Sequence, residues 1–256
     1  MCIYKNKLKK ILPTANILAY DRFLFIGAHC GDIAKSSGAT VALLRENKKH
    51  VKFLICTDTA SFVDSELSYN ERKEIKQKEE LCAAMLLDVK EVEFLPFKDF
   101  GDYDKTELNK ELTDVITGYK PDVIFVSDKT INEINDDDQT VTKIVEQIFL
   151  TLRNKNQCAQ RNLPYTPIKA IAYYNTVKPN YYFNTAKHAA RELQAVMAYE
   201  SELPKKNEEK YEYMLTYSVY INTKMKKNGM KNKFRKSEGF RVITVKSSHN
   251  FPETIM

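Results

Sequence analysis

The sequence has few of the residues that mark flexible or cross-linked proteins. It contains only seven glycines and eight prolines, so no long flexible linker divides it. Its five cysteines are scattered without paired spacing, which excludes a zinc ribbon and predicts reduced thiols in a cytoplasmic protein. No apolar run approaches the roughly 18 residues that a membrane span requires. The basic opening segment is followed by an apolar stretch that polar residues and a proline interrupt, which is a poor secretory signal.

Composition and charge are those of an ordinary folded chain. The 256 residues are 43% hydrophobic and 29% charged, which excludes disorder as the main state and favours one large domain or two small ones. The net charge is +6, and lysines concentrate near the start and in the segment 224–236. No groove-reading motif accompanies them, so no nucleic-acid partner is expected and the basic segment is interpreted as solvated surface.

Short apolar runs alternate with helical patterns along the chain. Continuous apolar runs are typical of strands covered on both faces, and they occur at 23–28, 51–56, 92–95, 123–126 and 168–173. Helical patterns are found at 36–47, 65–87, 106–117, 140–153 and 185–200. The alternation predicts an α/β fold with a doubly wound, mainly parallel sheet. We expect a single domain over 1–256, with its core at about 20–180 and a smaller, irregular, tyrosine-rich part at about 181–256.

Acidic residues follow four of the predicted strands. Ligands of an open parallel sheet bind beyond the carboxyl ends of its strands, where this chain has the segments 29–32, 57–59, 96–99 and 127–138. Carboxylates gathered at one edge repel one another unless a cation neutralises them. His29 and Asp32 stand in one turn, and Asp138 could supply the third ligand of a catalytic metal site. The alternative is a hydrogen-bonded core histidine at His29 and a helix cap at Asp32.

Several motifs resemble, in order, those of the PIG-L/LmbE-like N-acetylglucosaminyl deacetylases. The segment FLFIGAHCGD at 23–32 is similar to the hydrophobic strand and A-H-P-D-D-E turn of that family. VEFLPFKD at 92–99 resembles its V-x-F-L-G-F-x-D segment. PDVIFVSD at 121–128 resembles the strand before its H-P-D-H motif, which falls on 135–138. The resemblance continues to the family's A-E-x-F ending, at 237–241, and therefore covers most of the chain.

This resemblance implies a Rossmann-like domain that holds one zinc ion and removes an acyl group from the nitrogen of a small-molecule amino-sugar conjugate. The family's zinc ligands fall on His29, Asp32 and Asp138, so a carboxylate replaces an imidazole at 138. The family's general base falls on Gly31, and its acyl-stabilising histidine falls on Asn135. Loss of a positioned base usually slows catalysis by about 10²- to 10⁴-fold.

The altered motif leaves several interpretations open. Asp58 and Asp137 are candidate substitute bases from other loops, and Asn135 is a candidate hydrogen-bond donor to the acyl oxygen. The chain is then either a metal-dependent deacetylase or a non-catalytic sugar-binding or assembly protein of the same fold. A methyltransferase that uses S-adenosylmethionine is a remote third alternative. Tyrosines around the fifth strand favour a buried sheet edge or a homo-oligomer contact over sugar stacking.

Overall fold

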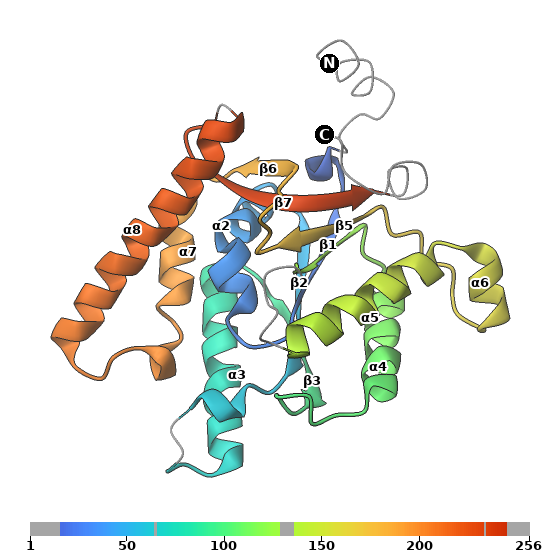
Figure 1. Cartoon of the computed structure of the whole chain (residues 1–256), viewed down its shortest axis with the longest axis horizontal. Coiled ribbons are helices and arrows are strands. Elements are labelled where there is room, and N and C mark those ends of the chain that lie inside the picture. The colour runs from blue at the N-terminus through green and yellow to red at the C-terminus, as the bar shows by residue number, and fades with distance from the viewer. Residues whose placement is uncertain (1–15, 64–65, 129–135, 233, 245–256) are drawn as a thin grey trace.

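The computed structural model describes residues 16–63, 66–128, 136–232 and 234–244. A seven-stranded sheet runs through this part of the chain in the order β3-β2-β1-β4-β5-β7-β6 (Figure 1). The strands are β1 (Arg22–Gly27), β2 (His50–Thr57), β3 (Glu91–Phe97), β4 (Val123–Ser127), β5 (Ala170–Tyr174), β6 (Tyr181–Asn184) and β7 (Ser237–Thr244). The first five strands pair in parallel, whereas β7 is antiparallel to β5 and β6. The predicted α/β fold with a mainly parallel sheet is confirmed.

Helices cover both faces of the sheet (Figure 1). They are α2 (Asp32–Glu46), α3 (Tyr69–Leu86), α4 (Lys105–Tyr119), α5 (Asp136–Leu152), α6 (Lys155–Gln160), α7 (Ala189–Val196) and α8 (Asn207–Asn232), with the short 3-10 helices η1 (Ile17–Ala19), η2 (Ala60–Phe62) and η3 (Glu200–Glu202). α2, α3 and α7 contribute to the hydrophobic core on one face, and α4, α5 and α6 to the core on the other. α8 packs against α7 and β7.

β1 is buried on both faces, as its continuous apolar run predicts. Phe23 and Phe25 belong to one core, and Leu24 and Ile26 belong to the other. Phe25 stacks on Phe125 of β4, with ring centroids 4.2 Å apart. The strand order reverses between β1 and β4, so the carboxyl end of β1 is the place where an open α/β sheet binds its ligand.

The last third of the chain is more regular than its sequence predicts. Instead of an irregular part, β6 and β7 extend the main sheet and α8 runs for 26 residues. Tyr217 contacts both Tyr213 and Tyr220 along α8, at a helical spacing that the polar residues between them obscure in the sequence. The helix expected at 185–200 is shorter, because a turn in which the backbone N of His188 donates to the carbonyl of Thr185 precedes α7, and α7 ends at Val196 before η3. No helix in the described ranges is long and apolar enough to cross a membrane.

Candidate metal centre

The turn after β1 is held in place by several hydrogen bonds. The backbone N of Cys30 donates to Oγ1 of Thr59 at 2.9 Å, and the backbone N of Gly31 donates to Oε2 of Glu80 on α3 at 2.8 Å. Thr57, at the end of β2, donates its hydroxyl to a carbonyl of the same turn. Gly31 has a φ of +96°, in the left-handed region that glycine adopts without strain. These contacts fix the directions of the side chains on either side of Gly31.

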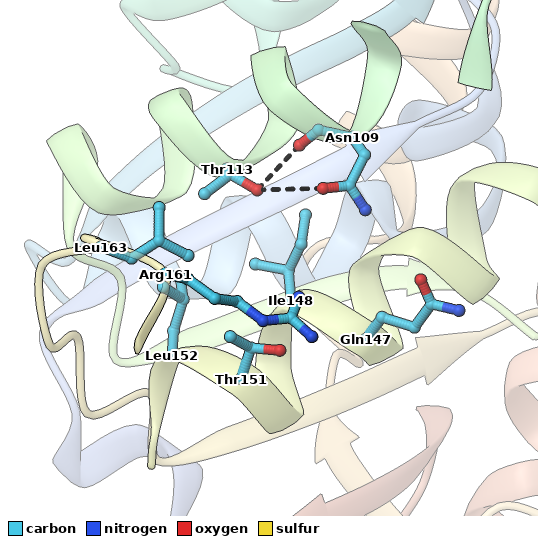
Figure 2. Close-up of a pocket in the computed structure, with 8 residues that line it drawn as sticks. All are labelled: Asn109, Thr113, Gln147, Ile148, Thr151, Leu152, Arg161 and Leu163. Atoms are coloured by element: carbon cyan, nitrogen blue, oxygen red, sulfur yellow. Dashed lines mark hydrogen bonds between the residues drawn. The ribbon is translucent and has the colours of Figure 1, made fainter. Parts of the chain in front are cut away.

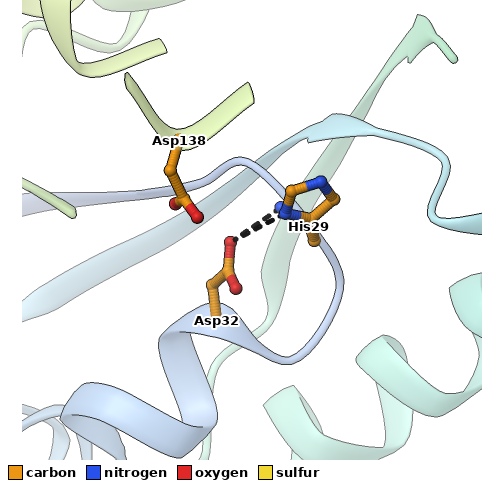
Figure 3. Close-up of side chains that lie close together, drawn as sticks. All are labelled: His29, Asp32 and Asp138. Carbon is orange, nitrogen blue, oxygen red and sulfur yellow. Dashed lines mark hydrogen bonds and ion pairs between the residues drawn. The ribbon is translucent and has the colours of Figure 1, made fainter. Parts of the chain in front are cut away.

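His29, Asp32 and Asp138 come together at the carboxyl end of β1 (Figure 3). One donor atom from each side chain lies within 4.8 Å of the other two. Asp32 opens α2 and Asp138 stands in the first turn of α5, so two helix N-termini contribute to one cluster. His29 and Asp138 are buried, whereas Asp32 is partly exposed. The three residues predicted to be metal ligands are therefore neighbours, although more than one hundred positions separate Asp138 from the other two.

Asp137 contacts His29 through the second nitrogen of the ring. Nε2 of His29 lies 3.1 Å from Oδ2 of Asp137, and Nδ1 lies 3.7 Å from Oδ2 of Asp32. Asp137 also accepts hydrogen bonds from two backbone amides at 100–101 and from the hydroxyl of Tyr103, at 2.7 to 2.8 Å. The contacts of Asp137 thus orient the imidazole so that Nδ1 is directed towards Asp32.

The carboxylates around His29 favour a positive charge at the centre of the cluster. Burial alone lowers the pKa of His29, but hydrogen bonds to Asp137 and Asp32 and the nearby charge of Asp138 raise it to about 10. Burial alone raises the pKa of Asp137, but hydrogen bonds, first of all from His29 and Tyr103, hold it below its ordinary value. The same negative field that retains a proton on the imidazole attracts a metal cation.

The donor set fits a divalent metal ion. One imidazole nitrogen and two carboxylate oxygens are ligand types of catalytic zinc sites, which use three protein ligands and keep one position open. In such sites, the ring nitrogen of histidine that does not bind the metal usually hydrogen-bonds a carboxylate, which fixes the orientation of the ring. Asp137 makes this contact with Nε2 of His29. Two carboxylate ligands also suit harder ions than zinc, which prefer oxygen.

The position expected to supply the general base faces a lysine. A Cβ on Gly31 would lie 2.9 Å from Nζ of Lys35, one turn further along α2. Lys35 forms an ion pair with Glu202 of η3 and lies over the ring of Tyr199. Glu202 also pairs with Lys76, which is fully buried in α3. The space into which a base would project from position 31 is therefore occupied by an ammonium group.

Asp58, a candidate substitute base, has partners in its own loop. Its carboxylate accepts hydrogen bonds from the backbone N of Ala60 and from the hydroxyl of Tyr69. Burial raises the pKa of Asp58, and the negative charge of Asp99 raises it further. The cluster of neighbouring ligand atoms contains His29, Asp32 and Asp138 but not Asp58. Asn135, the candidate donor to the acyl oxygen, lies outside the described residues.

Asp128 follows β4 at the same edge of the sheet and is neutralised within the chain. Arg241 of β7 donates Nε and Nη2 to its two carboxylate oxygens, at 3.0 and 3.2 Å. The guanidinium also lies over the ring of Tyr173, 3.8 Å from its centroid. A metal ion is therefore not needed to balance every acidic segment at this edge, because the negative charge at Asp128 already has an arginine partner.

Cys30 and the tyrosines of the fifth strand belong to the interior. Burial, with the charge of Glu80, raises the pKa of the Cys30 thiol well above its ordinary value, so the thiol is neutral. Tyr173 and Tyr174 are buried, and the hydroxyl of Tyr174 donates to the carbonyl of Ile26. These two tyrosines are therefore buried as expected, but in a strand between β4 and β7 rather than at an edge of the sheet.

A surface pocket lies between α4 and α5 (Figure 2). It is lined by side chains that include Thr113 of α4, Ile148 and Thr151 of α5, and Arg161. These residues of α5 are in its second half, whereas Asp137 and Asp138 stand in its first turn. The pocket therefore contains none of the residues predicted for the metal site.

Comparison with known proteins connects this geometry to an enzyme family. Residues 24–149 match the family model described as PIG-L, GlcNAc-PI de-N-acetylase. The chain is 28% identical over 231 residues to diacetylchitobiose deacetylase of Thermococcus kodakarensis, which covers 87% of this chain and 83% of that protein. It is similar to the solved N,N'-diacetylchitobiose deacetylase of Pyrococcus horikoshii, with 26% identity, a TM-score of 0.81, and coverage of 98% of this chain and 96% of that one.

A more distant structural relative has a different printed activity. GalB, the 4-carboxy-2-hydroxymuconate hydratase of Pseudomonas putida KT2440, is 14% identical, with a TM-score of 0.70 and coverage of 87% of this chain and 96% of that one. At this identity the likeness shows the fold alone. The fold is thus shared by deacetylases and a hydratase, and function has to be argued from the residues of the site.

Proposed function

Because residues 24–149 match the PIG-L family model, we propose that this chain is a metal-dependent N-deacetylase of N-acyl amino-sugar conjugates. The observation that carries the proposal is the meeting of His29, Asp32 and Asp138, with donor atoms within 4.8 Å of one another. The relatives that act on diacetylchitobiose support an amino sugar as the substrate class. The remote methyltransferase alternative has no support from these comparisons.

His29, Asp32 and Asp138 would hold the metal, with zinc the first candidate. Bound there, a divalent ion supplies a Lewis acid that polarises the amide carbonyl and lowers the pKa of water. Asp137 holds His29 with Nδ1 directed towards Asp32 and thereby sets the direction of this ligand. Asp137 is therefore proposed as a positioning residue rather than a substitute base, because its oxygens accept hydrogen bonds from Tyr103 and the loop 100–101.

The absence of a base at Gly31 limits the expected rate. No carboxylate projects from this position, and the ammonium of Lys35 occupies the adjacent space. Proton removal from the attacking water then depends on solvent, so we expect turnover about 10²- to 10⁴-fold slower than with a positioned base. Asn135 remains a predicted hydrogen-bond donor to the acyl oxygen, and Asp58 a weaker candidate for the base because Tyr69 and Ala60 contact its carboxylate.

A second candidate function is a non-catalytic protein that binds an amino sugar. The specific observation in its favour is again the lysine at the base position, because a nearby ammonium group does not accept a proton from water. Both candidates keep the same fold and ligand class, and they differ only in turnover. Self-association and a cytoplasmic location stay predictions from the sequence.

Acetate release distinguishes the two candidates. Purified protein loaded with Zn²⁺ or Mn²⁺ should release acetate slowly from N-acetylglucosamine or N,N'-diacetylchitobiose, and a chelator should stop the reaction until metal is added back. The ordinary turnover of an enzyme is about 10 s⁻¹. The measurement is an enzyme-coupled acetate assay that is run for long enough to detect rates about 10⁴-fold below this value. Metal-loaded protein that binds the sugar but releases no acetate would establish the non-catalytic alternative.

Asp137→Asn should weaken metal binding without removing a ligand. The amide keeps the size of the side chain but loses the charge that holds the His29 ring, and losing such a partner usually lowers metal affinity about 10- to 100-fold. Competition with a chromophoric chelator measures the change. Asp128→Asn is the matched control, because Asp128 is as buried as Asp137 and is paired with Arg241 at the same sheet edge. Equal affinities of the two variants would refute the positioning role of Asp137.

A further inference from the structure

Two exposed phenylalanines stand beside the metal centre. Phe62 of η2 and Phe100, in the loop after β3, stack with ring centroids 5.6 Å apart and an interplanar angle of 19°. The two residues remain 50% and 72% exposed, respectively, so their mutual contact leaves much of both rings in solvent. Exposed aromatic side chains beside a candidate active site are common in ligand-binding sites.

The aromatic pair is tied to the centre through His29 and Asp137. The ring of Phe62 meets the imidazole of His29 edge to face, with centroids 5.9 Å apart. The backbone N of Phe100 donates to Oδ2 of Asp137, the same oxygen that faces Nε2 of His29. A row of three rings therefore leads outward from the metal ligands, in the order His29, Phe62, Phe100, and its far end is the most exposed.

We propose that Phe62 and Phe100 form a stacking platform for the pyranose rings of the substrate. One face of a pyranose carries C–H bonds whose hydrogens are weakly positive, and the face of an aromatic ring is negative, so the two surfaces attract each other and exclude water. This inference rests on the proposed function for its ligand, an N-acyl amino sugar, and adds the residues that bind it. The platform orients the sugar so that its acyl nitrogen lies at His29, Asp32 and Asp138.

The order of the rings assigns a sugar unit to each phenylalanine. Phe62 contacts His29, one of the candidate metal ligands, so the sugar that bears the reacting acyl group packs on Phe62. Phe100 is one ring further out, so the next sugar of a disaccharide or glycoconjugate packs on Phe100. The loop that carries Phe100 also carries the exposed Lys98 and Asp102, groups that hydrogen-bond sugar hydroxyls. Exposed aromatic rings with polar groups near them match the two-faced character of a sugar ring better than they match a phosphate.

The test compares binding of one sugar and of two sugars to metal-loaded protein, by calorimetry or by saturation-transfer NMR. Phe100→Ala should weaken N,N'-diacetylchitobiose binding about tenfold and leave N-acetylglucosamine binding unchanged. Phe62→Ala should weaken both ligands by a similar factor, and Phe100→Trp should keep wild-type affinity. Phe234→Ala, at an exposed phenylalanine between α8 and β7, is the matched control and should change neither. Metal content is measured in every variant, because Phe62 contacts His29.

The outcome separates this inference from the proposed function. Loss of disaccharide affinity in Phe100→Ala supports the platform even if the wild type releases no acetate, since binding is measured without turnover. Wild-type affinity for both sugars in Phe62→Ala and Phe100→Ala, with metal retained, overturns the platform even if acetate is released. A wild-type protein that binds neither sugar overturns it as well.

Discussion

A variant with Gly31→Asp and Asp138→His should release acetate from N-acetylated sugars about 10²- to 10⁴-fold faster than the wild type. The first substitution places a carboxylate at the position where the PIG-L family has its general base. The second returns an imidazole to the ligand set and makes the metal complex more positive, which strengthens the Lewis acid. An effect of this size is expected because a positioned base and a stronger Lewis acid act on the same step.

The structure sets two conditions on this restoration. A side chain at the left-handed φ of Gly31 costs roughly 1–2 kcal/mol of stability, although aspartate tolerates this region better than most residues. The new Cβ would also lie 2.9 Å from Nζ of Lys35, which would pair with the new carboxylate and reduce its basicity. Adding Lys35→Met to the double variant should therefore raise the rate further, with Lys76 still neutralising Glu202.

The matched control for the restored base is Gly31→Asn with Asp138→His. Asparagine has the size of aspartate and accepts the left-handed conformation, but its amide cannot take a proton from water. Initial rates of acetate release, with metal content measured in each protein, check the comparison. If the aspartate variant binds metal and is no faster than the asparagine variant, position 31 is not the missing base. If the wild type is already as fast as the aspartate variant, another residue acts as the base.

Most of the sheet could be predicted from the sequence because a strand that is buried on both faces is a continuous run of apolar residues. Phe23 to Ile26 are apolar without interruption, and they divide between the two cores. The C-terminal part could not be predicted in the same way. β7 lies between β5 and β6, but it contains Glu238 and Arg241, whose partners are Thr40 and Asp128 in distant elements, so it lacks the continuous apolar run of β1.

The candidate site could be predicted where it depends on turns that follow strands. His29 and Asp32 leave β1 in one turn, and Asp138 starts the helix after β4, so the topology alone brings them to one edge. The surroundings of these residues could not be predicted. Lys35 stands one helical turn after Gly31, but the partner of its ammonium group, Glu202, comes from a distant segment. Phe62 comes from η2 and Phe100 from the loop after β3, and a single phenylalanine in such a short segment has no pattern that indicates exposure beside a site.

His29→Ala should abolish metal binding, and it is the second change with a large expected effect. The substitution removes the one nitrogen ligand and leaves Asp32 and Asp138 as two like charges without the imidazole between them. His188→Ala is the matched control. His188 is as buried as His29, at 6% exposure, and its Nε2 also pairs with a carboxylate, that of Glu46. A defect in folding or purification should affect both variants, whereas a defect in metal binding should affect only His29→Ala.

The most direct test of the whole account is the metal content of the purified protein, measured by plasma mass spectrometry after dialysis against a weak chelator. The account predicts about one divalent ion per chain in the wild type and in His188→Ala, and almost none in His29→Ala. Equal metal content in His29→Ala and the wild type, or no metal in any of the three proteins after loading with Zn²⁺ or Mn²⁺, would contradict it.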